Sequence, residues 1–218
     1  MENKRPRMTI TLITINVVVY ILMLIAGGAS NINVLLEFGA KDNALIIAGQ
    51  VWRLFTAMFV HLSLQHIVLN MVTLYFLGAQ IEWLFGPTRF IVIYVLSGIG
   101  GNIASFAFNP AISAGASTAL FGLFGAFLML GESFRNNPYI HSMAKQFLVL
   151  VILNLVFDLM GSSIDIWGHL GGLVSGFLLG YIVSVPRLGK VKISKRIIAF
   201  IALSLVFVLG YLKGMHVI

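Results

Sequence analysis

Long apolar stretches recur along the whole chain, and they constrain its fold more than any other feature. A helix needs about 20 mostly apolar residues to cross the hydrocarbon core of a bilayer. The chain is 59% hydrophobic and only 10% charged, whereas soluble domains are roughly half apolar and one quarter charged. We therefore predict an all-α membrane bundle of about seven spanning helices. The predicted spans are 9–28, 63–81, 90–108, 117–131, 146–160, 166–185 and 197–212.

The polar segments between these runs are too short to form a soluble domain, so we predict one transmembrane domain over residues 1–218. A short basic segment, 1–8, precedes the first run. No small-residue cleavage site follows that run, and we expect it to be a retained helix. The chain has no cysteine, which excludes disulfides, iron–sulfur clusters and zinc–thiolate sites. The sequence thus predicts a multi-pass protein, which we assign to the cell membrane.

The distribution of basic residues predicts how the bundle is oriented. With the N-terminus inside and seven spans, all of the 14 lysines and arginines except Lys41, Arg53 and Lys213 fall on the inner side. This asymmetry follows the positive-inside rule. We therefore predict an N-in, C-out topology. It also explains the net charge of +7 without a nucleic acid partner.

The segment 44–60 is apolar enough to suggest an eighth span. An eighth span would reverse every later helix and place the basic cluster 187–196 outside, so we predict a long outer loop over about 29–61. Long loops in compact domains are usually functional. By themselves, Trp52 and Arg53 in this loop indicate an interfacial anchor beside a lipid head-group contact.

Polar side chains inside a membrane bundle are costly, and a functional role is the default hypothesis for them. His66 and Asn70 are four residues apart and share one face of the helix predicted at 63–81. His61 lies at the entrance of that helix. The alternative for each residue alone is a hydrogen bond between helices, which contributes about 0.6 to 2 kcal/mol.

Ser117 begins the helix predicted at 117–131, directly after the turn marked by Asn109 and Pro110. Free N–H groups and the helix dipole favour negative charge at such a position. A lone serine in a membrane helix more often bonds back to a carbonyl four residues earlier. The pattern differs from the nucleophile elbow of soluble hydrolases, because no strand precedes it.

His169 lies about one turn into the helix predicted at 166–185. Small residues at four-residue intervals follow it and permit close approach of another helix. These residues are Gly172, Gly176 and Gly180, and the helix of Ser117 carries Gly122, Gly125 and Ala126 for the same contact. Such packing would bring Ser117 and His169 within hydrogen-bond reach, although a packing stripe with an incidental histidine is the alternative.

The predicted topology places His66, Asn70, Ser117 and His169 in the outer half of the bundle. A serine becomes nucleophilic when a positioned base takes its proton. The tetrahedral intermediate then requires donors aimed at its oxyanion. Ser117, His169 and the pair of His66 and Asn70 are suited to these three roles.

At this point the sequence resembles the rhomboid family of intramembrane serine proteases. The resemblance covers about residues 9–185, the six-helix core of the family, and 197–212 is similar to the extra helix that some members append. Positions that fit the family pattern are His61, His66 and Asn70, Ser117 in a Gly-x-Ser motif, His169 with Gly172, and Trp52, Arg53, Glu82 and Gly86.

The resemblance implies that Ser117 is the nucleophile and His169 the general base. It assigns the oxyanion hole to His66, Asn70 and the Ser117 backbone N–H. His61, Arg53, Glu82 and Gly172 are then structural supports, and Phe121 is the aromatic ring that packs against the catalytic histidine. Thr118 departs from the family, because it stands where the common Gly-x-Ser-Gly pattern has glycine, and its stiff side chain is expected to alter access to Ser117.

The expected partners are membrane lipid and transmembrane protein substrates, with no cofactor and no metal ion. A Ser-His dyad is predicted, since no acid is clearly supplied for His169. Asp165 fits a helix N-cap better than a third catalytic member. Asp158 is interpreted as an outer-loop residue, and His141 and His216 receive no role.

Two other functions compete with this prediction. A metal transporter or zinc-dependent enzyme could use His61, His66 and His169, because imidazole suits several transition metals. However, no carboxylate lies near them within the spans and no His-Glu-x-x-His motif is present. The other function is a catalytically inactive rhomboid-like protein that binds membrane clients, which Thr118 slightly favours.

Overall fold

The computed structural model describes residues 5–160 and 165–217, and helices account for nearly all of the regular structure in these ranges. Within them, β structure is limited to two isolated bridges, Lys41 with Ser113 and Val185 with Gly189. The all-α fold class is therefore confirmed. The elements are α1 Arg7–Ile25, α2 Ile32–Glu37, α3 Asn43–Ile47, α4 Arg53–Thr56, η1 Ala57–Phe59, α5 Leu64–Thr73, η2 Leu74–Gly78, α6 Ala79–Phe85, α7 Pro87–Phe108, α8 Ser117–Ser133, α9 Pro138–Met160, α10 Ile166–Val183 and α11 Ile193–Gly214.

Six helical stretches among the described residues are long and apolar enough to cross a membrane. They are α1, the continuous stretch α5–η2–α6, α7, α9, α10 and α11, so the chain is a multi-pass membrane protein. The helix expected at 117–131 is α8, which has 17 residues and is a shorter apolar helix.

Several predicted spans begin or end at other residues than expected. The span predicted at 63–81 continues to Phe85, with a single π-helical turn over Leu74–Gly78. The span predicted at 146–160 begins earlier, at Pro138. The Asn137 side chain accepts hydrogen bonds from the backbone N–H groups of Tyr139 and Ile140, and proline is favoured in the first turn because it lacks the N–H that would need a partner.

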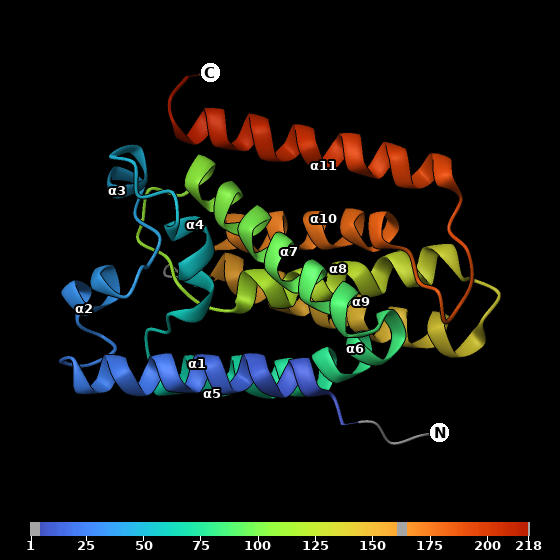
Figure 1. The fold of residues 1–218 in the computed structure, drawn as a ribbon, viewed down its shortest axis with the longest axis horizontal. Helices are drawn as coiled ribbons and strands as arrows, with labels where there is room; N and C mark the ends of the chain where they lie inside the picture. Colours follow the sequence, from blue (N-terminus) through green and yellow to red (C-terminus); the bar gives the residue numbers. More distant parts are fainter. Residues whose placement is uncertain (1–4, 161–164, 218) are drawn as a thin grey trace.

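Residues 44–60 do not form one spanning helix, because they are divided among the short elements α3, α4 and η1. Asp42 caps α3 by accepting a hydrogen bond from the Leu45 N–H at 2.9 Å. Together with α2, these short helices gather at one end of the bundle, where α11 ends (Figure 1). The opposite end holds the start of α1, so α1 begins and α11 ends at opposite ends of the molecule.

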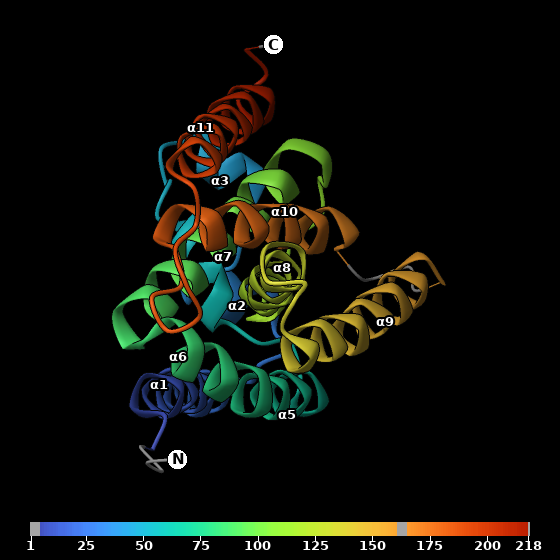
Figure 2. The same ribbon diagram turned by 90° about the vertical axis from the view of Figure 1, so that its right-hand side faces the viewer.

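The short helix α8 lies in the middle of the bundle, between α10 and α7 on one side and α5 and α9 on the other (Figure 2). Nearly every α8 residue from Thr118 to Gly131 is buried. By contrast, α1, α9 and α11 expose many large apolar side chains, including Leu24, Phe157 and Ile198. The outer helices therefore present the apolar surface expected to face lipid, and α8 is covered by protein.

The glycines on α10 allow it to contact α8 through the backbone. A Cβ atom added to Gly172 would lie 2.0 Å from the Thr118 carbonyl oxygen, and one added to Gly176 would lie 1.9 Å from the Gly122 carbonyl oxygen. Any larger residue at either position would therefore force the two helices apart. This contact fixes the position of the first turn of α10 relative to the first turn of α8.

Candidate active site

The loop before Ser117 is held by a buried lysine from the segment after α2. Lys41 is fully buried, and its Nζ donates to the carbonyl oxygens of Asn109 at 2.5 Å and Ala111 at 2.9 Å. Its backbone N–H also donates to the Ser113 carbonyl at 2.8 Å. Burial lowers the pKa of Lys41 to about 8, and the nearby Asp165 partly opposes this shift. These bonds fix the path of the chain into α8, a role of Lys41 that was not predicted from the sequence.

Ser117 is the first residue of α8, and the backbone just before it makes a close approach that requires glycine. Gly115 has a φ of +137°, and a Cβ there would lie 2.7 Å from His66 Nε2 and 3.6 Å from Asn70 Nδ2. The side chains of His66 and Asn70 therefore border the chain two residues before Ser117. As the first residue of the helix, Ser117 also presents a backbone N–H that has no acceptor within the helix.

His169 lies in the first turn of α10 and faces Ser117. The Asp165 side chain caps this helix by accepting from the Gly168 N–H at 3.1 Å, as the sequence predicted. His169 Nε2 lies 2.9 Å from Ser117 Oγ, which is a hydrogen-bond distance. The Phe121 ring, one turn along α8, stacks on the imidazole with a centroid separation of 4.2 Å and an angle of 9°.

His66 and Asn70 carry buried polar atoms that have no hydrogen-bond partner among residues 5–160 and 165–217. They are His66 Nδ1 and Asn70 Nδ2. Both residues lie on α5, whose first turn is capped by Ser63 accepting from the His66 N–H at 3.2 Å. Since an unpaired buried polar group costs about 1–3 kcal/mol, an unused donor beside Ser117 is an expensive feature. It is the geometry expected of a group that binds a developing negative charge.

His61 supports the same loop from the segment between η1 and α5. Its Nε2 accepts a hydrogen bond from the Ala116 N–H at 3.4 Å, and its ring contacts the His66 ring edge to face at 5.1 Å. Burial, with a smaller contribution from His66, lowers the pKa of His61 to about 3. The ring is therefore neutral near pH 7, which its role as an acceptor requires.

Arg53 and Glu82 lie away from Ser117 and bind backbone groups. Arg53 is only 6% exposed, and its guanidinium donates to the Leu36 and Ala40 carbonyls, each at 2.8 Å. The head-group contact inferred from the Trp52-Arg53 pair is therefore wrong for Arg53, although Trp52 is 55% exposed. Glu82 accepts from the backbone N–H groups of Met8 at 3.1 Å and Thr9 at 2.9 Å, which ties α6 to the start of α1.

Thr118 packs its side chain between α8 and two neighbouring helices. Its Cβ would lie 2.7 Å from a Cβ built on Gly101 of α7, and its Cγ2 would lie 3.1 Å from one built on Gly168 of α10. Glycines on both helices thus provide space for the larger residue. The Thr118 hydroxyl is buried and has no hydrogen-bond partner in the described part of the chain.

The position of Asp158 differs from the sequence prediction. The residue was interpreted as part of an outer loop, but α9 continues to Met160 and Asp158 is only 7% exposed. Its Oδ2 lies 2.6 Å from His169 Nδ1. Asp165, the other acid considered, bonds instead to Gly168 and to the Ser105 hydroxyl.

The sequence does contain a signal for Asp158. Inward-facing residues on α9 recur at three- and four-residue intervals. These residues are Ile140, Ala144, Phe147, Val151 and Leu155, and Asp158 is the next position in the series. An ionisable residue on the inward stripe of a spanning helix is a functional candidate.

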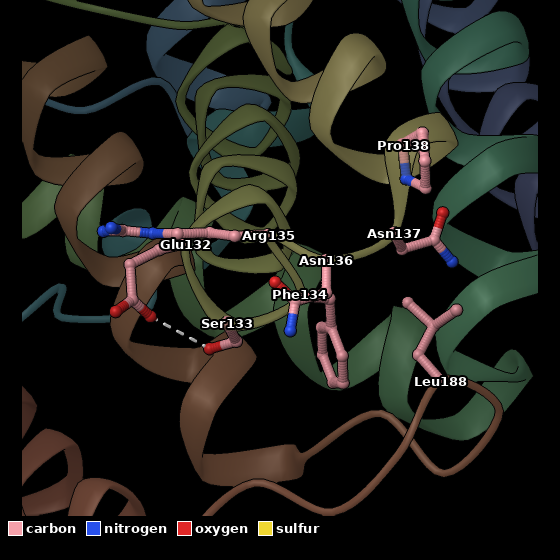
Figure 3. Close-up of a pocket in the computed structure, with 8 residues that line it drawn as sticks. All are labelled: Glu132, Ser133, Phe134, Arg135, Asn136, Asn137, Pro138 and Leu188. Atoms are coloured by element: carbon pink, nitrogen blue, oxygen red, sulfur yellow. Dashed lines mark hydrogen bonds between the residues drawn. The ribbon is translucent and has the colours of Figure 1, made fainter.

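A cavity of about 700 Å³ lies at the other end of α8 (Figure 3). It is lined by Glu132, Ser133, Phe134, Arg135, Asn136, Asn137, Pro138 and Leu188. Ser117 begins α8 and Ser133 ends it, so the cavity is about 24 Å from Ser117 at 1.5 Å per residue. This cavity is therefore separate from the group formed by Ser117, His169, His66 and Asn70.

The fold and this group of side chains define a class: a multi-pass helical membrane protein with a serine and a histidine paired inside the bundle. Residues 48–186 match the Rhomboid domain family. The chain is 37% identical over 216 residues to Rhomboid protease GluP of Bacillus subtilis (strain 168), covering 99% of this chain and 42% of that protein. This chain therefore belongs to the rhomboid family.

Relatives from other organisms show the same similarity. RHOMBOID-like protein 1 of Arabidopsis thaliana is 39% identical over 159 residues, covering 70% of this chain and 40% of the relative. Rhomboid-like protease 1 of Toxoplasma gondii is 38% identical over 154 residues, covering 68% of this chain and 52% of the relative. The chain thus spans about half or less of the length of these relatives.

Proposed function

We propose that this chain is an intramembrane serine endopeptidase that cleaves transmembrane segments of membrane proteins. The observation that carries the proposal is the 2.9 Å separation of Ser117 Oγ and His169 Nε2 inside a membrane bundle. Named proteases among the relatives support the same activity. Ser117 is half-buried while His169 is buried, so the nucleophile lies on the more open side of the pair.

The reaction assigns one role to each side chain. Ser117 Oγ attacks the peptide carbonyl as His169 Nε2 takes its proton, and the protonated imidazole then gives that proton to the leaving amine, which leaves the acyl group on Ser117. Water, deprotonated by His169, then cleaves this ester, and the proton returns to Ser117 Oγ. The oxyanion accepts hydrogen bonds from Asn70, His66 and the Ser117 backbone N–H. His66 Nδ1 and Asn70 Nδ2 have no hydrogen-bond partner among the described residues, and the Ser117 N–H has no acceptor within its own helix, so no such bond has to break when the charge develops.

The position of the pair indicates where a substrate is cut. Ser117 and His169 lie in the first turns of their helices, and under the predicted topology these turns are near the outer face. A substrate helix must unwind there to expose a peptide bond, because in lipid an intact helix keeps its backbone bonded internally. We therefore expect cleavage near the outward end of the substrate segment, promoted by Gly or Pro.

The competing functions have less support. Among the described residues, no group of three or more His, Cys, Asp and Glu side chains is arranged to hold a metal ion. A client-binding protein without activity would have no use for an aligned Ser117 and His169. Thr118, which favoured that alternative, packs against glycines of neighbouring helices.

Cleavage of a reporter transmembrane substrate in liposomes tests the proposal. Ser117→Ala and His169→Ala should each abolish cleavage, and the double variant should be no worse, because residues acting as one unit are non-additive. Ser133→Ala, at the other end of α8, is the matched control and should retain activity. Appreciable activity in folded Ser117→Ala would contradict the assignment of this chain as a serine protease. Mapping of the cleaved bonds by mass spectrometry to the inner end of the substrate segment would contradict the proposed cleavage near the outer face.

A further inference from the structure

Asp158 reaches the proposed catalytic histidine from a helix that carries none of the other site residues. Its carboxylate oxygen Oδ2 is 2.6 Å from His169 Nδ1, and both side chains are buried, with Asp158 7% and His169 8% exposed. Asp158 is on α9, whereas Ser117 is on α8 and His169 on α10. The contact therefore joins α9 to α10 inside the bundle.

The direction of this hydrogen bond follows from the chemistry of its two partners. An ionised carboxylate can only accept hydrogen bonds, so Nδ1 of His169 carries the proton and donates it to Asp158. A neutral imidazole has one N–H, which leaves Nε2 as an acceptor. Nε2 is the atom that faces Ser117 Oγ at 2.9 Å.

The remaining contacts of the ring agree with this arrangement. Phe121 covers one face of the imidazole, but an aromatic face fixes neither the tautomer nor the rotation within the ring plane. The side-chain oxygens of Asp165 bond to the Gly168 N–H and the Ser105 hydroxyl, whereas the oxygen that lies at His169 Nδ1 belongs to Asp158. Among the described residues, Asp158 is the acid whose side chain is hydrogen-bonded to His169 Nδ1, so it is the acid that can orient this imidazole.

We propose that Asp158 is a positioning residue that holds His169 in the tautomer and orientation needed to accept the Ser117 proton. The proposal rests on the protease function proposed above, and it extends the predicted dyad to a Ser-His-Asp unit. Asp158 also stabilises the imidazolium that forms when His169 takes the proton, because a carboxylate 2.6 Å away favours the charged ring.

The test compares Asp158→Asn with Asp158→Glu in full-length protein reconstituted in liposomes. Asn preserves size but removes the charge, and Glu preserves the charge but adds a methylene. A positioning role predicts that Glu retains more activity than Asn, whereas a purely structural role predicts the reverse because Asn fits the same space. We expect Asp158→Asn to lower kcat by roughly 10- to 1000-fold, a loss that does not exceed the upper end of the roughly 10²- to 10⁴-fold that a general base can supply.

Two further readouts separate positioning from folding and from substrate binding. KM should change by less than about twofold, since a base acts in the transition state and not in the ground state. The rate at which a fluorophosphonate labels Ser117 should fall with kcat, because labelling needs the base but no transmembrane substrate. Labelling is normalised to the folded fraction, so a loss of stability does not obscure the result.

Asn154→Ala provides the matched control on the same helix. Asn154 is exposed one turn before Asp158, and its side chain bonds only back to the Leu150 carbonyl. It should cleave and label at the wild-type rate. The proposal is overturned if folded Asp158→Asn keeps kcat and labelling within about twofold of wild type. A wild-type protein that neither cleaves nor labels at Ser117 would instead overturn the proposed function itself.

Discussion

At the scale of single residues, the site combines side chains that bind the backbone with donors that have no partner among the described residues. Lys41, Arg53 and His61 each hold backbone groups in place through at least one hydrogen bond. Asn70 Nδ2 is buried and has no partner in the part of the chain that the structure describes. A protein that leaves such a group unpaired gives up about 1–3 kcal/mol of stability, which is consistent with a donor kept for a substrate.

Substitution of Asn70 tests this interpretation. Asn70→Ala should slow turnover by roughly 10- to 1000-fold, the scale of a lost oxyanion donor. It should leave the melting temperature unchanged or slightly raised, because an unpaired buried amide is removed. His61→Ala should act mainly by lowering stability, since His61 bonds to the Ala116 backbone. The assignment of Asn70 to catalysis and of His61 to stability is wrong if His61→Ala lowers turnover more than Asn70→Ala in proteins of equal thermal stability.

The residues proposed for catalysis could be found from the sequence because they are polar side chains within apolar runs. Ser117, His169, His66 and Asn70 all stand out in this way. Asp158 did not, because it lies near the end of a predicted span, where a carboxylate is ordinarily solvated. The role of Lys41 was missed for a related reason. A basic residue in a loop indicates topology, but its burial depends on contacts that form only in the folded protein.

At the scale of helices, the four-residue glycine repeat of α10 determines the distance between Ser117 and His169. Spacing alone predicted this contact, because residues four apart share a helix face. Other features depended on local chemistry or tertiary packing. The α9 start at Pro138 depends on capping by Asn137, and the π-helical turn within α5–η2–α6 had no signal that hydropathy could reveal.

Two glycines of this repeat provide a controlled comparison. In Gly172→Ala the new Cβ would lie 2.0 Å from the Thr118 carbonyl oxygen, so α10 must move relative to α8. In Gly180→Ala the nearest atom is Met129 Cε at 2.6 Å, the end of a flexible side chain that can turn away. Because a misplacement of about 1 Å can reduce rates about 100-fold, we expect a large loss of kcat in Gly172→Ala only. Equal losses of kcat in the two variants would contradict the proposed role of the α10 glycine repeat.

At the scale of the whole molecule, a short buried helix is surrounded by longer helices that face lipid. This arrangement places the start of α8, which is the helix that begins at Ser117, near the end of the bundle that carries α2, α3 and α4 (Figure 1). Hydropathy predicted the number of apolar helices, because each span must satisfy its own backbone in lipid. It could not show that α8 is central, since a helix covered by protein and one exposed to lipid are both apolar.

We propose that Ser117 is a nucleophile activated by His169 within the membrane domain. The most direct test is to react the purified protein with a fluorophosphonate and identify the modified residue by peptide mass spectrometry. We expect a single adduct, on Ser117. It should form much more slowly in His169→Ala and be absent in Ser117→Ala. Folded protein that forms no adduct at Ser117, or reacts equally well without His169, would contradict it.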